Sequence, residues 1–451
     1  MNGTLLLGFL SRGISLAGNL ILLPLILIHL SHVEYTIWMV FLSALSLAIL
    51  LDCGFAAVIS RYFTYILAGC KELPDGALKY YKANDNDVSI DVDKRLFTLV
   101  YRFANHLYIL LSILLLIVLT AFWFFYLKDI ASQKGVEVLQ PWLLFSLSIV
   151  TTLYFNKFNA YFFGVKQVSS VYRTAMLSGI VYIAVAIYFV TNDMGLLGLA
   201  LAKLVSTLFY LIYCQFEFKR SPANKNITVD SYSFQSYINV FKKIKPIAIS
   251  TGIATLGAFC LNRASTFYVA RYLTDVDGAS LLLLMNLLST ITSVTYIYMN
   301  TRTPVLNSTI YQGEFLKIVK IQNDIYIKSL LFFSISCLGL FLFGPILLEL
   351  IGSKTKLPNT GIMAFAFLTY IGELFLAIST NFLTSQNNLK YAKYVAYTGF
   401  VYIFIAYIFI SSYPLMLVAV SCQFFVQLVF NFWYWPSIVL RKLYKYKQEC
   451  G

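Results

Sequence analysis

The chain has 451 residues, of which 59% are hydrophobic and only 12% are charged, and its formal net charge is +14. A soluble domain could not hide this much apolar surface from water, so the composition excludes a soluble globular protein and predicts one solvated by lipid. The basic residues fall mostly in loops on one side of the predicted membrane, so we expect no nucleic-acid partner.

Long apolar segments follow one another along the whole chain. A bilayer core of roughly 30 Å needs about 20 apolar residues per helical crossing, and about twelve segments meet this requirement. In chain order they are approximately 5–29, 35–58, 99–127, 142–163, 171–190, 196–213, 247–270, 280–300, 327–351, 362–383, 395–410 and 415–435. The segments lack the polar alternation of barrel strands, so each is predicted to be a helix. The first is too long for a signal-peptide core and is expected to be retained.

Basic residues mark one side of the predicted membrane. If the N-terminus lies inside, the cytoplasmic loops and the C-terminal tail hold most of the lysines and arginines. The opposite loops hold little beyond Lys128, Lys134, Arg271, Lys354 and Lys356. The positive-inside rule therefore predicts that both termini are cytoplasmic.

Short repeats indicate two homologous halves. LSHVE at 30–34 resembles LTDVD at 273–277, and GIVYI at 179–183 resembles GFVYI at 399–403. Six helices per half keep both halves in the same orientation, which predicts two six-helix bundles related by a pseudo-two-fold axis along the membrane normal. A cleft between such bundles can open to either side in turn, as in a transporter. The predicted domains are an N-terminal bundle at 1–215, a cytoplasmic linker at 216–245, a C-terminal bundle at 246–438 and a basic cytoplasmic tail at 439–451.

Two charges lie at the end of the second predicted helix, in the stretch LDCGFAAVISRYFTY. Nine residues separate Asp52 from Arg61, which would place them on opposite faces of an unbroken helix, so they can meet only if the chain bends at Gly54. One interpretation is a gating latch that breaks when the cavity opens inward. The other is that Asp52 caps or anchors the helix end while Arg61 anchors the chain at the lipid phosphates.

This helix end resembles the second helix of the O-antigen flippases (Wzx type) and related polysaccharide exporters of the multidrug/oligosaccharidyl-lipid/polysaccharide (MOP) superfamily. Asn262 and Arg263 in the seventh predicted helix are similar to that family's pattern, although an acidic residue is often found where Asn262 stands. The resemblance covers nearly the whole chain in helix count and loop lengths.

The resemblance implies an all-α fold like that of the MATE transporters, and a flippase rather than an enzyme. Its implied substrate is an undecaprenyl-pyrophosphate-linked oligosaccharide, which moves from the cytoplasmic to the periplasmic leaflet of a bacterial inner membrane. Membrane lipid, a polysaccharide polymerase and a chain-length regulator are the other implied partners. No cofactor is implied beyond coupling to H⁺ or Na⁺.

Polar residues inside the predicted spans are candidates for a cationic substrate cavity. Lys203 lies roughly 13 Å into the sixth predicted helix and cannot easily reach the interface, so we expect it to line a cavity. Arg263 lies roughly 12 Å from the end of the seventh. The alternative for both is a structural ion pair, and for Arg12 it is an interfacial anchor. Asn262 and Asn381 complete the candidate cavity, where an asparagine would serve as an interhelical hydrogen-bonding residue or contact sugar hydroxyls.

Glu373 in the tenth predicted helix is the only acid besides Asp52 well inside a predicted span. We interpret it as a partner for a cavity cation or a carrier of a coupling proton, and the alternative is a carboxyl hydrogen-bonded to a neighbouring helix. The seven cysteines form no CxxC pair, so we expect no metal site.

Two other kinds of protein would also contain many membrane helices. A membrane O-antigen polymerase or ligase would carry one long exterior loop, and no predicted exterior loop exceeds roughly 15 residues. A drug or cation exporter of the same superfamily is the main alternative, because a fold does not decide its ligand. Its cavity should favour carboxylates, whereas bases outnumber acids inside the spans predicted here.

Overall fold

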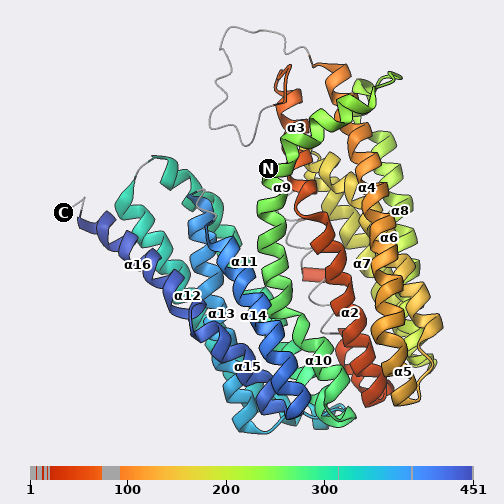
Figure 1. The fold of residues 1–451 in the computed structure, drawn as a ribbon, viewed down its shortest axis with the longest axis vertical. Helices are drawn as coiled ribbons and strands as arrows, with labels where there is room; N and C mark the ends of the chain where they lie inside the picture. The colour runs from red at the N-terminus through yellow and green to blue at the C-terminus, as the bar shows by residue number, and fades with distance from the viewer. Residues whose placement is uncertain are drawn as a thin grey trace. The chain divides into compact units, whose positions relative to one another are not determined.

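The computed structural model of the chain describes residues 21–73, 92–312, 314–386 and 390–448, together with Leu7, Gly13, Ile14 and Gly18. All regular secondary structure in these residues is helical, which confirms the predicted all-α class (Figure 1). They contain nine helices that are long and apolar enough to cross a membrane, or ten when one bent pair is counted as a span. Most of the first predicted helix, including Arg12, lies outside the described residues.

Large apolar side chains on the outer faces of these helices are exposed. Leu110, Ile212 and Phe404 have relative accessibilities of 64%, 65% and 66%. Contiguous apolar surface of this kind is not stable in water and is expected on helices that contact lipid. The chain is therefore a multi-pass membrane protein.

The helices of the N-terminal part follow the predicted spans with added short elements. They are α2 (His32–Asp52), α3 (Phe55–Leu67), α4 (Lys94–Phe122), the π-helix η1 (Trp123–Leu127), α5 (Lys128–Lys134), α6 (Leu139–Gly164), α7 (Val168–Thr191), α8 (Gly195–Arg220), the 3₁₀-helix η2 (Pro222–Asn226) and α9 (Phe234–Asn262). In Figure 1, α4, α6 and α8 run lengthwise beside one another, with α6 in contact with both neighbours.

The C-terminal part is built in the same way. Its helices are α10 (Ala264–Tyr272), α11 (Asp275–Gln312), α12 (Phe315–Leu350), α13 (Thr360–Ser385), α14 (Tyr391–Ser412), α15 (Met416–Leu428) and α16 (Asn431–Gln448). Helix α13 contacts α11, α12, α15 and α16, so it is the central helix of this part. It carries Glu373.

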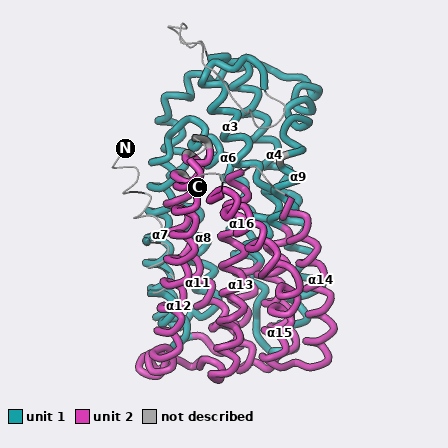
Figure 2. Tube along the Cα trace, turned by 90° about the vertical axis from the view of Figure 1, so that its left-hand side faces the viewer, with its two compact units in different colours: residues 1–29, 44–255 teal, residues 30–43, 256–451 magenta. Residues whose placement is uncertain are grey.

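The chain forms two compact units, which Figure 2 shows in teal and magenta. Unit 1 comprises Met1–His29 and Ala44–Thr255, and unit 2 comprises Leu30–Ser43 and Leu256–Gly451. The division thus falls within α9 and also within α2, while the predicted linker at 216–245 lies in unit 1. That linker segment contains the end of α8, all of η2 and the first part of α9.

The span formed by α9 and α10 bends by 51° between its segments Phe234–Pro246 and Ala248–Tyr272. Pro246 lies inside the helix, where it removes a backbone donor and its ring clashes with the preceding turn, so a kink is expected there. The predicted seventh span begins directly after this kink.

The second predicted span is broken at Gly54, as the pairing of Asp52 with Arg61 would require. Gly54 has a φ of 74°, a left-handed conformation that glycine adopts without strain, and it separates α2 from α3. Gly164 allows α3 to pack closely on α6, because a Cβ there would lie 2.5 Å from Cβ of Phe63. Thr64 Oγ1 donates to the Gly164 carbonyl at 3.0 Å. Together these contacts fix α3 against the end of α6.

Candidate functional site

In unit 1 the carboxyl group of Asp52 lies at the centre of a hydrogen-bonded network that joins four helices. Tyr108 Oη and Asn156 Nδ2 donate to Asp52 Oδ1 at 2.6 and 3.0 Å. Asn156 Oδ1 accepts from Asn159 Nδ2 at 2.9 Å, and Tyr210 donates to Asn159 Oδ1 at 3.1 Å. The acid at the end of α2 is therefore held by neutral donors from α4 and α6, and the network continues to α8.

The structure does not bring Asp52 and Arg61 together as an ion pair. Arg61 Nε instead donates to the Ala57 carbonyl in its own helix at 3.3 Å. The predicted latch is therefore not closed in this conformation, although the bend at Gly54 that it requires is present. Any gating role for the two charges stays a prediction.

Lys157 in α6 is a buried cation that the sequence analysis did not single out. Its side chain is 7% exposed, and Nζ donates to Asn105 Oδ1 at 2.5 Å. Nζ also lies 3.6 Å from the ring centroid of Tyr154, whose hydroxyl donates to the same Asn105 oxygen at 3.2 Å. Within the described ranges no carboxylate pairs with it. The signal was available, because a lysine inside the predicted span 142–163 is as unusual as Lys203.

Lys203 lies within α8 and is half-buried. Nζ is 5.8 Å from the ring centroid of Tyr182 on α7, a cation–π contact that leaves all three of its hydrogen atoms available. No ion pair or hydrogen bond joins this ammonium group to another residue of the described chain. Unit 1 therefore holds two cations inside its helices, and neither is neutralised by a described carboxylate.

In unit 2 the buried network centres on Glu373. Gln423 Nε2 and Gln427 Nε2, one helical turn apart on α15, donate to Glu373 Oε1 at 2.6 and 3.1 Å. Arg263, at the break between α9 and α10, attracts the Glu373 carboxylate electrostatically but does not form an ion pair with it. Its neighbour Asn262 is exposed. The predicted pairing of Glu373 with a cation is thus present only as a longer-range attraction.

Asn381 and the end of α11 form a separate polar region of unit 2. Asn381 Nδ2 donates to Thr303 Oγ1 at 2.9 Å and so joins α13 to α11, as expected for an interhelical asparagine. Nearby on α11, Tyr298 donates a short hydrogen bond to Asp324, which also pairs with Lys328 at 2.7 Å. The sequence singles out neither Asp324 nor Lys328 as a site residue.

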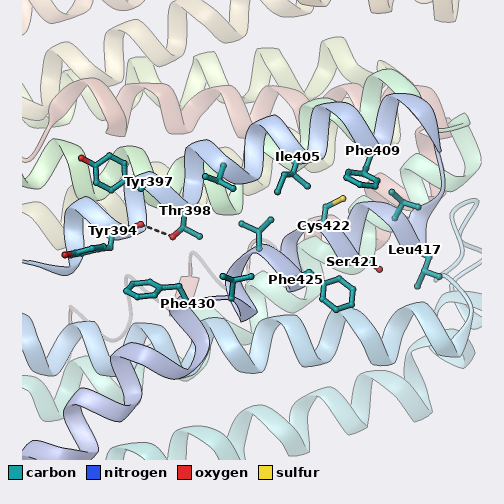
Figure 3. Close-up of a pocket in the computed structure, with 14 residues that line it drawn as sticks. Tyr394, Tyr397, Thr398, Ile405, Phe409, Leu417, Ser421, Cys422, Phe425 and Phe430 are labelled. Atoms are coloured by element: carbon teal, nitrogen blue, oxygen red, sulfur yellow. Dashed lines mark hydrogen bonds between the residues drawn. The ribbon is translucent and has the colours of Figure 1, made fainter.

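An apolar groove in the described part of unit 2 lies between α14 and α15. It encloses about 630 Å³ and carries no charged residue. Figure 3 shows Tyr394, Ile405 and Phe409 on the α14 side, with Cys422 and Phe425 on the α15 side. Such a lining suits hydrocarbon rather than a diphosphate or a sugar, so the groove is not the polar site.

No protein-family model and no curated protein matches the sequence. Solved structures do match in fold. An inward-facing multidrug-resistance MATE family transporter of the MOP superfamily is 15% identical, with 97% of this chain and 95% of that one covered and a TM-score of 0.60. The fold is that of the MATE transporters.

Two further MATE-fold structures agree. An outward-facing MATE transporter of the MOP superfamily is 13% identical over 96% of this chain and 94% of that one, with a TM-score of 0.55. A MOP superfamily transporter from Pyrococcus furiosus is 15% identical over 97% and 96% of the two chains, also with a TM-score of 0.55. The expected MATE-like fold is confirmed over nearly the full length of the chain.

Proposed function

We propose that this MATE-fold protein is a transporter that flips an undecaprenyl-pyrophosphate-linked oligosaccharide across a bacterial inner membrane by alternating access. The observation that carries the proposal is that Lys157 and Lys203 lie inside unit 1 without a described carboxylate partner. An ammonium group inside a membrane protein is costly and is normally paired. Two ammonium groups that no described carboxylate pairs with suit an anionic ligand.

The chemistry of the proposed substrate fits such groups. A diphosphate that leaves water needs charged donors, which lysine supplies as a point charge and arginine as a planar fork. Arg263 offers the fork in unit 2, where Glu373 attracts it without pairing with it. Asparagines such as Asn262, exposed on α9, offer amide groups that suit sugar hydroxyls.

The second candidate is an exporter of drugs or cations with the same fold. The carboxyl groups of Asp52 and Glu373, held by neutral donors, are the observation that favours it. These groups also suit H⁺ or Na⁺ coupling, which either transporter would need. The Pyrococcus furiosus relative is described as having a binding pocket of reversed polarity that suggests a different function. Proteins of similar fold can thus differ in the charge of the binding pocket, and here the lysines inside unit 1 favour an anionic ligand.

A gene deletion tests the proposal. In a polysaccharide-producing host, loss of this protein should make lipid-linked repeat units accumulate on the cytoplasmic face, and the wild-type gene should reverse this. Sensitivity to cationic dyes is measured in the same strains. If repeat units reach the periplasm normally while dye efflux falls, the drug-exporter function is correct and the flippase proposal is wrong.

The membrane placement and partners belong to the same proposal. We place both termini in the cytoplasm because the loops on that side carry most of the basic residues. A flippase of this kind would deliver its product to a polysaccharide polymerase and a chain-length regulator, and membrane lipid would surround it.

A further inference from the structure

A stripe of polar side chains runs along α15 and α16 in unit 2. Gln423, Gln427, Asn431 and Trp435 recur at every fourth position, a spacing that keeps side chains on one helical face. Both helices contact α13, which carries Glu373. Gln423 and Gln427 reach Glu373, and Trp435 packs in a core cluster with Phe382 and Leu383 near the C-terminal end of α13. The stripe therefore extends from Glu373 toward that end of unit 2.

Beyond Glu373, the remaining buried polar atoms of this stripe have no hydrogen-bond partner among the described residues. Gln427 and Asn431 are 0% exposed and Trp435 is 4% exposed. Gln427 Oε1, both polar atoms of the Asn431 side chain and Trp435 Nε1 make no hydrogen bond with the described protein. About nine in ten buried polar groups are satisfied in folded proteins, so four orphans on three consecutive positions of one stripe need an explanation.

The kinds of atom left over identify the ligand. Gln427 Oε1 and Asn431 Oδ1 accept hydrogen bonds, while Asn431 Nδ2 and Trp435 Nε1 donate them. A bare cation would satisfy only the acceptors, and an anion only the donors. Water both donates and accepts, and buried water typically makes about three hydrogen bonds to such groups.

One feature of α16 agrees with water. Pro436 has no N–H, so the carbonyl of Phe432 cannot form its usual helical bond and becomes another acceptor. A cavity of about 270 Å³ between α12, α13 and α16 is lined mainly by apolar side chains and by no residue of the stripe, so it is not part of the water site.

We propose that a file of water molecules occupies the seam between α13 and the Gln427–Asn431–Trp435 stripe and carries protons between Glu373 and the C-terminal end of α13. Gln427 turns its amide nitrogen to the carboxylate, so its oxygen faces away and is the first acceptor for the file. Both glutamines bond Glu373 Oε1, which leaves Oε2 to meet a water. The functional part of this inference rests on the coupling role of Glu373 proposed above.

Other groups also act on the proton at Glu373. The charged and titratable side chains that interact electrostatically with it come from three other segments of unit 2 and from α13 itself. They are Arg263 at the α9–α10 break, Tyr296 on α11, Tyr370 on α13 and Tyr402 on α14. None of them lies on the stripe, so changes on α16 test the water file separately.

Hydrogen–deuterium exchange at the Glu373 carboxyl tests the file directly. The full-length protein in lipid nanodiscs is held at a pH that protonates this carboxyl, and its infrared C=O band is assigned by its loss in Glu373→Gln. After a switch to D₂O, the band should shift quickly in the wild type. Asn431→Leu should slow the shift at least about tenfold, because a buried group without a solvent path exchanges only when the structure opens.

Further variants keep the result interpretable. Trp435→Phe removes the indole donor, and Gln427→Met removes the free acceptor together with the donor to Glu373. Both should also slow the exchange, whereas Asn431→Ser should keep most of it. Asn192→Leu, an exposed amide at the end of α7 in unit 1, is the matched control and should exchange like the wild type. If Asn431→Leu does not fold, the Trp435 and Gln427 variants decide the outcome.

The proposal is overturned if the Glu373 carboxyl of the wild type exchanges no faster than that of Asn431→Leu, Trp435→Phe and Gln427→Met. That result would leave the transport proposal standing if Glu373→Gln still abolishes transport. Conversely, fast exchange that depends on the stripe, with normal transport in Glu373→Gln, would establish the water file and reject coupling through Glu373.

Discussion

The hydroxyl of Tyr108 donates a 2.6 Å hydrogen bond to the carboxyl of Asp52, and this bond joins the end of α2 to the middle of α4. Such a bond is worth about 1 kcal/mol or more in free energy of unfolding. We expect Tyr108→Phe to lower the free energy of unfolding by about 1 kcal/mol or more and to reduce transport. Tyr188→Phe, at a tyrosine that is 64% exposed, is the control and should change neither property. Equal stability of both variants would show that the Tyr108 bond does not form.

The two charges of the proposed latch make a second prediction. Asp52→Asn and Arg61→Ala should each reduce transport at normal abundance if the charges meet in another conformation. Exchanging the two charges should then restore part of it. Because Arg61 bonds its own helix here, transport by the variant with the exchanged charges is the measurement that decides whether the two charges meet in another conformation. Normal transport by both single variants would make these residues anchors only.

A substitution of Lys157 has different expected effects on stability and on transport. It has no described carboxylate partner, so Lys157→Met removes a buried charge without leaving another one unpaired, and the free energy of unfolding should stay the same or rise. Transport should fall at least about tenfold if Lys157 contacts an anionic substrate, since loss of a buried charge partner costs about 2 kcal/mol or more in binding. Transport is measured as delivery of repeat units to the periplasm.

The matched control for this lysine is Lys219→Met, at an exposed position near the end of α8. It makes the same chemical change and should leave both stability and transport unchanged. A Lys157→Met protein that is destabilised but transports normally per molecule would show that the lysine is structural.

The fold was predictable from sequence because each crossing is an apolar run of membrane length. The ends of the helices were less predictable from the sequence. Hydropathy placed the eighth and ninth spans at 280–300 and 327–351, whereas α11 continues to Gln312 and α12 begins at Phe315. Hydropathy marks where lipid ends, but a helix continues as long as its backbone bonds and packing do.

The candidate site was predictable only residue by residue. Asp52 and Glu373 attract notice because acids are rare inside apolar runs. Their partners do not, since Tyr108 and Asn156 are 56 and 104 positions from Asp52 and are common residue types. The same limit applies to Asn431 and Trp435, whose unpaired atoms are visible only once the helices are packed.

The membrane topology is testable by labelling from outside. Lys225→Cys in η2 and Ser132→Cys in α5 are both exposed and lie on opposite sides of the predicted membrane. In a background without the native cysteines, a membrane-impermeant maleimide applied to intact cells should label Ser132→Cys and not Lys225→Cys. The reverse pattern would invert the topology and with it the proposed direction of transport.

Lys203 and Arg263 test the cationic mechanism itself. Among the described residues no carboxylate pairs with Lys203, and Arg263 does not form an ion pair with Glu373, so neither is needed to neutralise a described acid by direct contact. Each should interact with a diphosphate more strongly than an exposed charge does, because pairing is stronger where the local dielectric is low. Lys203→Ala and Arg263→Ala should therefore impair export without lowering abundance.

Two further measurements decide whether Lys203 and Arg263 bind the substrate or stabilise the helices. They are the export activity of Lys203→Arg and the abundance of each alanine variant. Lys203→Arg keeps the charge and should retain part of the export that Lys203→Ala loses, because an anion still meets a cation at that depth of α8. Export is measured as repeat units delivered to the periplasm per molecule of protein in the membrane. If both alanine variants export at the wild-type rate, no diphosphate meets these two cations and the cationic-cavity mechanism is wrong. If their abundance collapses, the two side chains stabilise the helices instead.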